Sequence, residues 1–292
     1  MLKQFQDKAK DSFKRLSLFV RKRQNTQITQ VMLRNQYILM KKLIEPHEMP
    51  SLKDVGFKAY SEFEEDGILL YIFSIIGTTN KRVVEICAGD GIECMAANLI
   101  INHGWEGLLF DGNIEQVNKA VEFYATHETT LYHPPIFKHA WITKENVNDL
   151  IAESGFKGNI DLLSLDMDGN DYYIMEAIDV VKPRVIICET HNIIPSELSL
   201  TIPYKADFNR KDDLHAEFMG MSLLAATKLL NKKGYRLIGS HRHGFNAIFM
   251  LNDTGKDFFP EVTVTSVHDN PYTKSRRDSA WKDVEDLPWQ KI

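Results

Sequence analysis

The 292-residue sequence has only three cysteines and no apolar run that approaches the length of a membrane-spanning helix. Cys87 and Cys188 fall in predicted strands and Cys94 falls early in a predicted helix, so we expect small buried thiols rather than disulfides. The sequence has no CxxC spacing of the kind that binds a metal, and its N-terminus lacks the apolar segment of a secretory signal. These absences predict a cytoplasmic protein.

The net charge of −5 is small, but it is unevenly distributed. Residues 1–45 contain 11 Lys/Arg and 3 Asp/Glu, a net of +8, whereas the remainder contains 24 Lys/Arg and 37 Asp/Glu, a net of −13. An acidic body argues against nucleic acid as a partner. Apolar residues recur at helical spacing among the basic ones, which predicts a basic amphipathic helical arm over residues 1–50. The arm could pack on its own domain, form a homo-oligomer, or associate with an anionic membrane.

Strand and helix patterns alternate over residues 51–255, which we expect to form a single domain. Continuous apolar runs indicate strands that are covered on both faces, and the last two strands are close enough to form a hairpin. The pattern predicts an α/β fold with a doubly wound, mostly parallel seven-stranded sheet and one antiparallel strand near its edge. Residues 256–292 are expected to be an irregular C-terminal extension. The expected strands cover residues 82–87, 107–110, 136–140, 160–165, 185–188, 235–240 and 246–251.

Ligands of such sheets lie beyond the carboxyl ends of the strands, and this sequence places unusual residues there. The first strand carries Glu85 and leads into a loop with Gly89 and Gly91, which allow a close backbone approach to a ligand. The second strand ends at Asp111, 22 residues after Gly89. A carboxylate at this point can accept hydrogen bonds from both hydroxyls of a ribose. The GxGxxG pattern of dinucleotide-binding domains is absent.

This pattern resembles motif I of class I S-adenosylmethionine-dependent methyltransferases, although Cys87 stands where the family usually has its first glycine. A narrower resemblance, to the FkbM-type branch, is carried by SEFEEDGILL (61–70), LDMDGNDYY (165–173) and VIICETHN (185–192). It implies a Rossmann-like methyltransferase fold, S-adenosyl-L-methionine as the cofactor, and O-methylation of a small hydroxylated acceptor such as a saccharide. The cofactor contacts are then expected from Ser61, Asp66, Glu85, Cys87, Ala88, Gly89, Gly91, Asp111, Gly112, Ala140, Trp141 and Asp166.

Candidate catalytic residues follow the fourth and fifth strands. Asp166 and Asp168 come after the fourth strand, and Glu189 and His191 come after the fifth. Either Asp166 or His191 could accept the proton of an attacking hydroxyl. Asp166, Glu189 and Asn192 could instead hold a divalent cation such as Mg²⁺, which resembles the metal set of catechol-type O-methyltransferases with Glu in place of Asp and the Asn displaced by two residues. Asp168 could also be a simple turn residue before glycine.

Several of these residues have a second interpretation. Ser61 and Asp66 could cap a helix rather than cover the cofactor, and Trp141 could be a core residue rather than a stacking partner of adenine. The acidic loop residues could be caps without further function. The polar stretch over 193–218 is typical of an acceptor-binding loop. A non-catalytic cofactor-binding or interaction module, attached to a membrane or a partner by its arm, is the alternative function. The acceptor-loop candidates are Tyr204, Asp207, Phe208 and Arg210.

Overall fold

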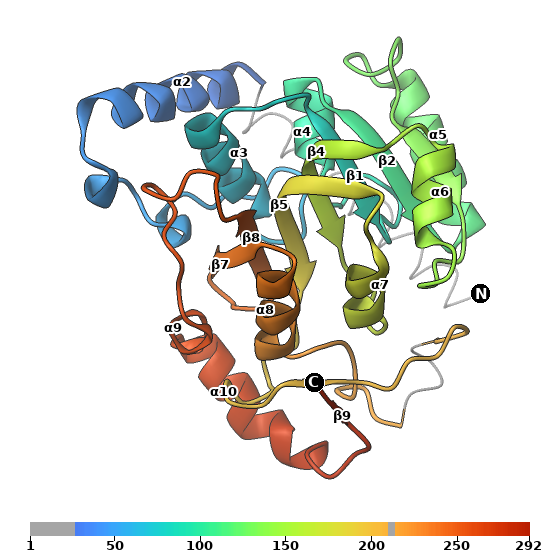
Figure 1. Cartoon of the computed structure of the whole chain (residues 1–292). Helices are drawn as coiled ribbons and strands as arrows, with labels where there is room; N and C mark the ends of the chain where they lie inside the picture. The colour runs from blue at the N-terminus through green and yellow to red at the C-terminus, as the bar shows by residue number, and fades with distance from the viewer. Residues whose placement is uncertain (1–26, 210–213) are drawn as a thin grey trace, which may run out of the picture.

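A computed structural model describes residues 27–209 and 214–292, so Arg210 and most of the predicted arm lie outside the described residues. A seven-stranded sheet with the order β3-β2-β1-β4-β5-β8-β7 forms the centre of the molecule (Figure 1). All pairings among β1 to β5 are parallel, and β8 runs antiparallel to both of its neighbours. The predicted fold class is confirmed. The strands are β1 Arg82–Ile86, β2 Glu106–Asp111, β3 Ile136–His139, β4 Gly158–Leu165, β5 Val181–Glu189, β7 Tyr235–Ser240 and β8 Asn246–Leu251.

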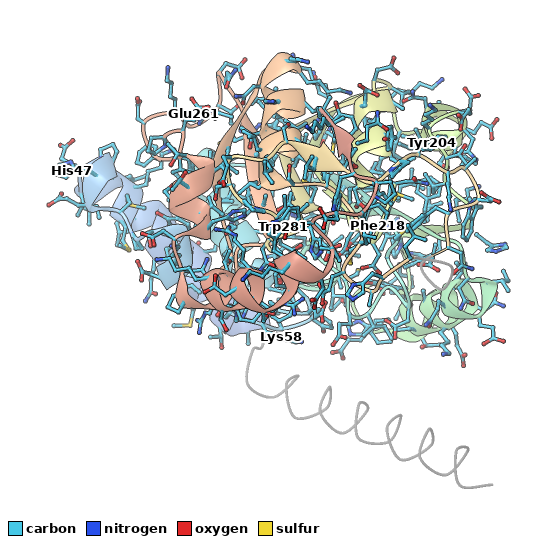
Figure 2. The ribbon with its side chains drawn as sticks, turned by 90° about the horizontal axis from the view of Figure 1, so that it is seen from below. His47, Lys58, Tyr204, Phe218, Glu261 and Trp281 are labelled. Carbon is cyan, nitrogen blue, oxygen red and sulfur yellow. The ribbon has the colours of Figure 1, made fainter. Side chains whose placement is uncertain are left out.

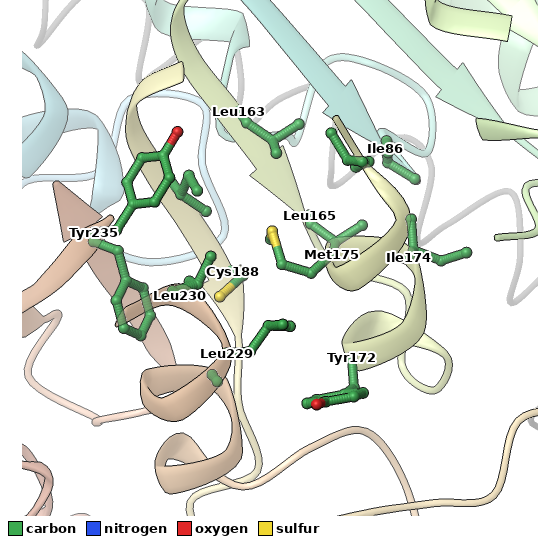
Figure 3. Close-up of a cluster of buried hydrophobic side chains, with 14 of the residues drawn as sticks. Ile86, Leu163, Leu165, Tyr172, Ile174, Met175, Cys188, Leu229, Leu230 and Tyr235 are labelled. Atoms are coloured by element: carbon green, nitrogen blue, oxygen red, sulfur yellow. The ribbon is translucent and has the colours of Figure 1, made fainter. Parts of the chain in front are cut away.

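Helices cover both faces of this sheet, because successive residues of each buried strand point to opposite sides. Val83 faces the layer that contains α3 and α4, whereas its neighbour Val84 faces the layer that contains α6, α7 and α8. Figure 3 shows the second layer, where Leu163 and Leu165 of β4 lie against Met175 of α7. The helices are α3 Glu65–Ile76, α4 Ala97–His103, α5 Ile114–Thr126, α6 Val147–Glu153, α7 Asp171–Ala177 and α8 Leu223–Lys232.

The described part of the arm is one helix, α2 (Gln27–Leu43), followed by a short 3₁₀ turn, Pro46–Glu48. Helix α2 packs on α3 and α4. Its buried face includes Tyr37 and Gln30, and the Gln30 amide exchanges two hydrogen bonds of 2.9 Å with the amide of Asn98. The interpretation in which the arm packs on its own domain therefore holds for this face of α2.

The expectation of an irregular C-terminal extension is wrong. Residues 256–292 contain α9 (Val264–His268), α10 (Pro271–Ala280), a 3₁₀ turn (Trp281–Asp283) and strand β9 (Gln290–Lys291), which pairs with β6 (Leu200–Thr201). This extension packs on the segment after β5 through a third apolar cluster. In this cluster the ring centroids of Trp289 and Phe218 lie 4.6 Å apart. Trp281 and Phe218 of this cluster are labelled near the middle of Figure 2, which views the molecule from below. Helix α10 has few apolar residues, so its sequence lacks a periodic signal, although Asn270 caps it and Pro271 begins it.

Candidate functional site

One row of side chains crosses the sheet at its carboxyl edge. The last residues of β1 and β4, Ile86 and Leu165, are direct partners, and Leu165 is in turn the partner of Cys188 in β5. The residue that follows each of them along the chain therefore lies at the same level of the sheet. The strand pairings extend this level through β2 and β3 on one side and through β8 on the other. The row is His139, Asp111, Cys87, Asp166, Glu189 and Asn246.

The loop after β1 needs an unusual backbone. Cys87, Gly89 and Gly91 have φ angles of 65°, 56° and 63°, in the left-handed region. A non-glycine residue pays roughly 1–2 kcal/mol in this region, which gives a physical reason for a glycine at position 87 and shows that the cysteine replaces it at a cost. A Cβ atom added to Gly91 would lie 2.2 Å from the Phe137 ring, whereas one added to Gly89 would meet no other atom of the described residues within 4 Å. Gly89 therefore borders open space.

Asp111 points at this loop. One carboxylate oxygen accepts a hydrogen bond of 2.9 Å from the Gly89 N–H, and the other accepts one of 2.8 Å from the Asn113 N–H. The two bonds fix the orientation of the side chain. A carboxylate oxygen can accept more than one hydrogen bond, so both oxygens keep a lone pair for a further donor. The predicted juxtaposition of Asp111 and Gly89 is therefore present.

A small pocket of about 90 Å³ lies beside this pair. Trp141 forms one wall: it is 51% exposed, its ring lies 3.1 Å from the position of a Cβ on Gly112, and its indole N–H donates to the Ala206 carbonyl at 2.8 Å. Trp141 is therefore not a core residue. Phe208 closes the pocket against Gly169. A cavity of roughly 150 Å³ holds a benzene ring, so an adenine could enter only if a wall residue moves. The lining is Cys87, Gly112, Ala140, Trp141, Ile142, Met167, Asn170 and Phe208.

Two residues expected to contact the cofactor, Glu85 and Ala88, make hydrogen bonds that hold the loop after β1 in place. The buried carboxylate of Glu85 accepts hydrogen bonds from the backbone N–H groups of Met95 and Ala96, at 2.9 and 2.8 Å. The N–H of Ala88, which is also buried, donates to the Phe110 carbonyl and ties the loop to β2. The Glu85 carboxylate therefore shapes the loop from behind, and its direct contact with the cofactor stays a prediction.

Ser61 and Asp66 are likewise used locally. One Asp66 oxygen accepts three backbone N–H groups, those of Ala59, Tyr60 and Ser61, at 2.5–2.8 Å. The Asp66 N–H donates in return to the Ser61 hydroxyl. Both side chains are buried, and burial raises the pKa of Asp66 to about 6. The capping interpretation therefore describes these two residues, which build the turn before α3.

Three carboxylates come together at the centre of the row. Oxygen atoms of Asp166, Asp168 and Glu189 all lie within 4.8 Å of one another. Burial and the negative charges of Asp171 and Asp168 raise the pKa of Asp166 to about 8, and burial and the charges of Asp166, Asp171 and Asp168 raise the pKa of Glu189. The two side chains are hydrogen-bonded to each other, so the pair holds a proton to a higher pH than isolated carboxyl groups do.

The backbone beneath these acids is a tight turn. Asp168 has a φ of 58°, which an Asp before Gly tolerates. The buried carboxylate of Asp171, the third acid of the same segment, accepts the N–H groups of Met167 and Gly169 at 2.9 Å each. The backbone of Asp168 therefore forms a turn, as one interpretation predicted. Its carboxylate lies close to those of Asp166 and Glu189.

His191 and Asn192 are directed elsewhere. The His191 Nε2–H donates to the Glu217 carbonyl at 2.8 Å, and Glu217 is paired with Arg276 of α10. The Asn192 amide donates to the His243 carbonyl at 3.0 Å. The structure therefore brings Asp168, rather than Asn192, together with Asp166 and Glu189, and it makes His191 a link to the C-terminal extension.

A buried polar group next to Glu189 was missed in the sequence. Asn246 is the cross-strand partner of Glu189, and its amide donates to Glu65 at 2.7 Å. The Nε2 atom of His241 lies 3.5 Å from the same Glu65 carboxylate, and burial lowers the pKa of this imidazole. Glu65 is far in the sequence from Asn246 and His241, so only the strand register could have revealed the position of Asn246 beside Glu189.

Comparisons with known proteins give no matching family model and no matching curated protein. Among solved structures, the N-terminal domain of EvdMO1 with SAH bound is 15% identical, with a TM-score of 0.42 over 74% of this chain and 94% of that one. A S-adenosylmethionine-dependent methyltransferase from Clostridium acetobutylicum is 11% identical, with a TM-score of 0.41 over 73% and 96%. Magnesium protoporphyrin IX methyltransferase from Synechocystis, with bound SAM, is 12% identical, with a TM-score of 0.39 over 63% and 76%. These similarities are distant, so function has to be inferred from the site itself.

Proposed function

We propose that this protein is a S-adenosylmethionine-dependent methyltransferase that methylates a hydroxyl of a small polar acceptor, such as a sugar, in the cytoplasm. The observation that carries the proposal is the pairing of Asp111 with Gly89 at the carboxyl edge of the sheet. A carboxylate with spare lone pairs lies there beside a glycine that borders open space. The choice of a hydroxyl and of a sugar rests on the FkbM-type resemblance of the sequence.

The residues around this pair fit the parts of the cofactor. Asp111 would accept the two ribose hydroxyls, and Gly89 would let the cofactor pass close to the backbone. Trp141, half exposed on the wall of the pocket, would stack on the adenine once the pocket widens. The bound cofactor supplies an activated methyl group on a sulfonium. The protein then has mainly to align the acceptor with that methyl group and to remove one proton.

Asp166 and Glu189 are the candidates for that proton transfer. Folding places the two acids in a half-buried pair at the centre of the row, next to the loop that would hold the cofactor. The ionised carboxylate of the pair can take the proton from the hydroxyl of the methyl acceptor. Its partner is protonated, so the two groups do not repel each other as two negative charges would. The raised pKa of each group brings the acid–base pair toward neutral pH, where such a base is most effective.

A divalent cation fits the same oxygens. Asp166, Asp168 and Glu189 supply hard ligands at a mutual spacing that suits Mg²⁺, which would polarise the acceptor oxygen. Asn192, the third ligand expected from the sequence, is bonded to His243 instead. We favour the metal-free reaction because a proton shared by Asp166 and Glu189 already lowers the negative charge of the pair without a cation. Activity that survives dialysis against a chelator supports this choice, and activity restored only by Mg²⁺ would replace it.

The proposal is tested first by isothermal titration of the purified full chain with S-adenosylhomocysteine, and then by transfer of labelled methyl groups to a panel of sugars and other polyols. Saturable binding and turnover are expected. If the wild-type protein does not bind the cofactor product, the proposal fails. Binding without turnover on any acceptor would favour the alternative function, a non-catalytic cofactor-binding or interaction module.

A further inference from the structure

Helix α2 is apolar on the face that it turns away from the protein. Its packed face carries the buried residues Gln30 and Tyr37. On the opposite side, four apolar side chains are 55–73% exposed, and at 100° per residue they fall within about 60° of arc and span roughly 22 Å of the helix. Surface helices normally place charged residues there. We call these four residues the outer stripe of α2: Ile28, Met32, Leu39 and Leu43.

The charge around the outer stripe has one sign. Helix α2 contains Arg34, Lys41 and Lys42 and no acidic residue. Lys42 is exposed and lies beside the stripe, whereas Arg34 and Lys41 lie toward the opposite side of the helix. The sequence before α2 adds eight Lys/Arg and two Asp. An apolar stripe with a lysine at its margin, on an arm whose charges are mostly basic, matches the interface of an anionic bilayer, where the apolar groups enter the headgroup region and the cations meet phosphates.

We infer that the outer stripe of α2 docks the protein on an anionic lipid surface. A second copy of the chain fits less well, because an α2–α2 contact would bring the basic residues of both copies together. An α2–α2 contact would also bury mainly the four stripe side chains of each copy, whereas the interface of a stable dimer buries roughly 20 residues per partner. No helix in the described ranges has the length and apolarity to cross a bilayer, so the contact would be peripheral.

The position of α2 in the fold determines how the carboxyl edge of the sheet would be oriented on a docked protein. Gln27 donates to the carbonyl of Asn102 near the end of α4, and Lys41 donates to the carbonyl of Ile75 near the end of α3. The chain runs from each of these helix ends into the amino end of a strand, β2 or β1. Both ends of α2 are thus fastened at the edge opposite the carboxylates, and α2 lies at that end of the molecule in Figure 1. A docked protein would keep its site accessible to water-soluble acceptors.

The test is co-sedimentation of the full chain with vesicles of phosphatidylcholine alone and of phosphatidylcholine mixed with phosphatidylglycerol. We expect binding to the mixed vesicles that weakens with added salt, and little binding to the neutral ones. The variant Ile28→Gln/Leu39→Gln keeps good helix formers and should bind at least about tenfold more weakly. The matched control is Ile114→Gln/Val121→Gln, which removes two similarly exposed aliphatic side chains from α5 and should bind as the wild type does.

Three results would overturn the inference. The wild type could fail to bind mixed vesicles, or the stripe variant could bind as well as the control. The wild type could also form a dimer in light scattering that the stripe variant dissociates, without vesicle binding, which would assign the stripe to a second copy. Circular dichroism of both variants shows whether they are folded, so a loss of binding is not mistaken for unfolding. The inference does not depend on methyl transfer.

Discussion

Replacing Asp111 by Ala should separate cofactor binding from folding. In the free protein the carboxylate makes two hydrogen bonds to backbone N–H groups, those of Gly89 and Asn113. In the complex it would add two bonds to the ribose hydroxyls. A hydrogen bond to a charged group contributes about 1.5 kcal/mol at the lower end of its range, which is appropriate for a half-buried side chain, so the two lost ribose bonds cost about 3 kcal/mol. This corresponds to a roughly 100-fold higher Kd for S-adenosylhomocysteine.

The assay is isothermal titration, combined with a urea melt of the same preparation. The control is Asp161→Asn, which alters a buried carboxylate near the amino end of β4, where Asp161 accepts the N–H groups of Thr79, Asn80 and Lys81 and pairs with Arg184. The control should lose stability and keep its affinity. An Asp111→Ala protein whose Kd stays within about threefold of the wild type would refute the assigned role of Asp111.

Three further results are expected. Gly89→Ala should abolish cofactor binding while lowering the free energy of unfolding by no more than about 2 kcal/mol, because its Cβ enters the open space and only the positive φ costs energy; titration and a urea melt check both. Asp166→Asn should reduce turnover about 100-fold. It should also weaken the pH dependence of the melting temperature. Because the pKa of Asp166 is raised to about 8, the folded wild type binds more protons than the unfolded chain between about pH 4 and this pKa, and it loses stability as the pH rises through that range. Trp289→Ala should destabilise the protein by about 2 kcal/mol and speed hydrogen exchange of segment 193–218, which Trp289 packs against through Phe218.

The sheet and the pairing of Asp111 with Gly89 were predictable because they rest on local signals. Continuous apolar strands, the glycines after β1 and the acid at the end of β2 are all visible in the sequence. Their relation in space follows from parallel topology, which brings the carboxyl ends of neighbouring strands to one edge. The contact between Asp111 and Gly89 is a direct consequence of that topology.

The remaining features depend on contacts between distant segments. Spacing alone cannot show that the Glu85 side chain turns toward Met95 and Ala96, because the same acid in the same strand could face either the loop or a ligand. The C-terminal helices were missed for a related reason. Helix α10 and the turn after it pack against apolar residues of the 193–218 segment, and α9 packs against α8 and β7, so none of these pieces carries a complete pattern of its own.

The register row explains why the acids of this chain divide into two kinds. Asp66 and Asp171 have oxygens occupied by backbone N–H groups, so their negative charge is used to hold turns in place. Asp166 and Glu189 lie where two parallel strands end side by side, and their hydrogen bond is to each other. A protein that needed these two acids only for structure would be expected to give them backbone donors as well, because a half-buried carboxylate next to like charges is costly without such donors. The pair instead keeps a titratable proton at the mouth of the sheet, one residue beyond the β1 and β4 partners Ile86 and Leu165, and this is the position that a base acting beside a bound methyl donor requires.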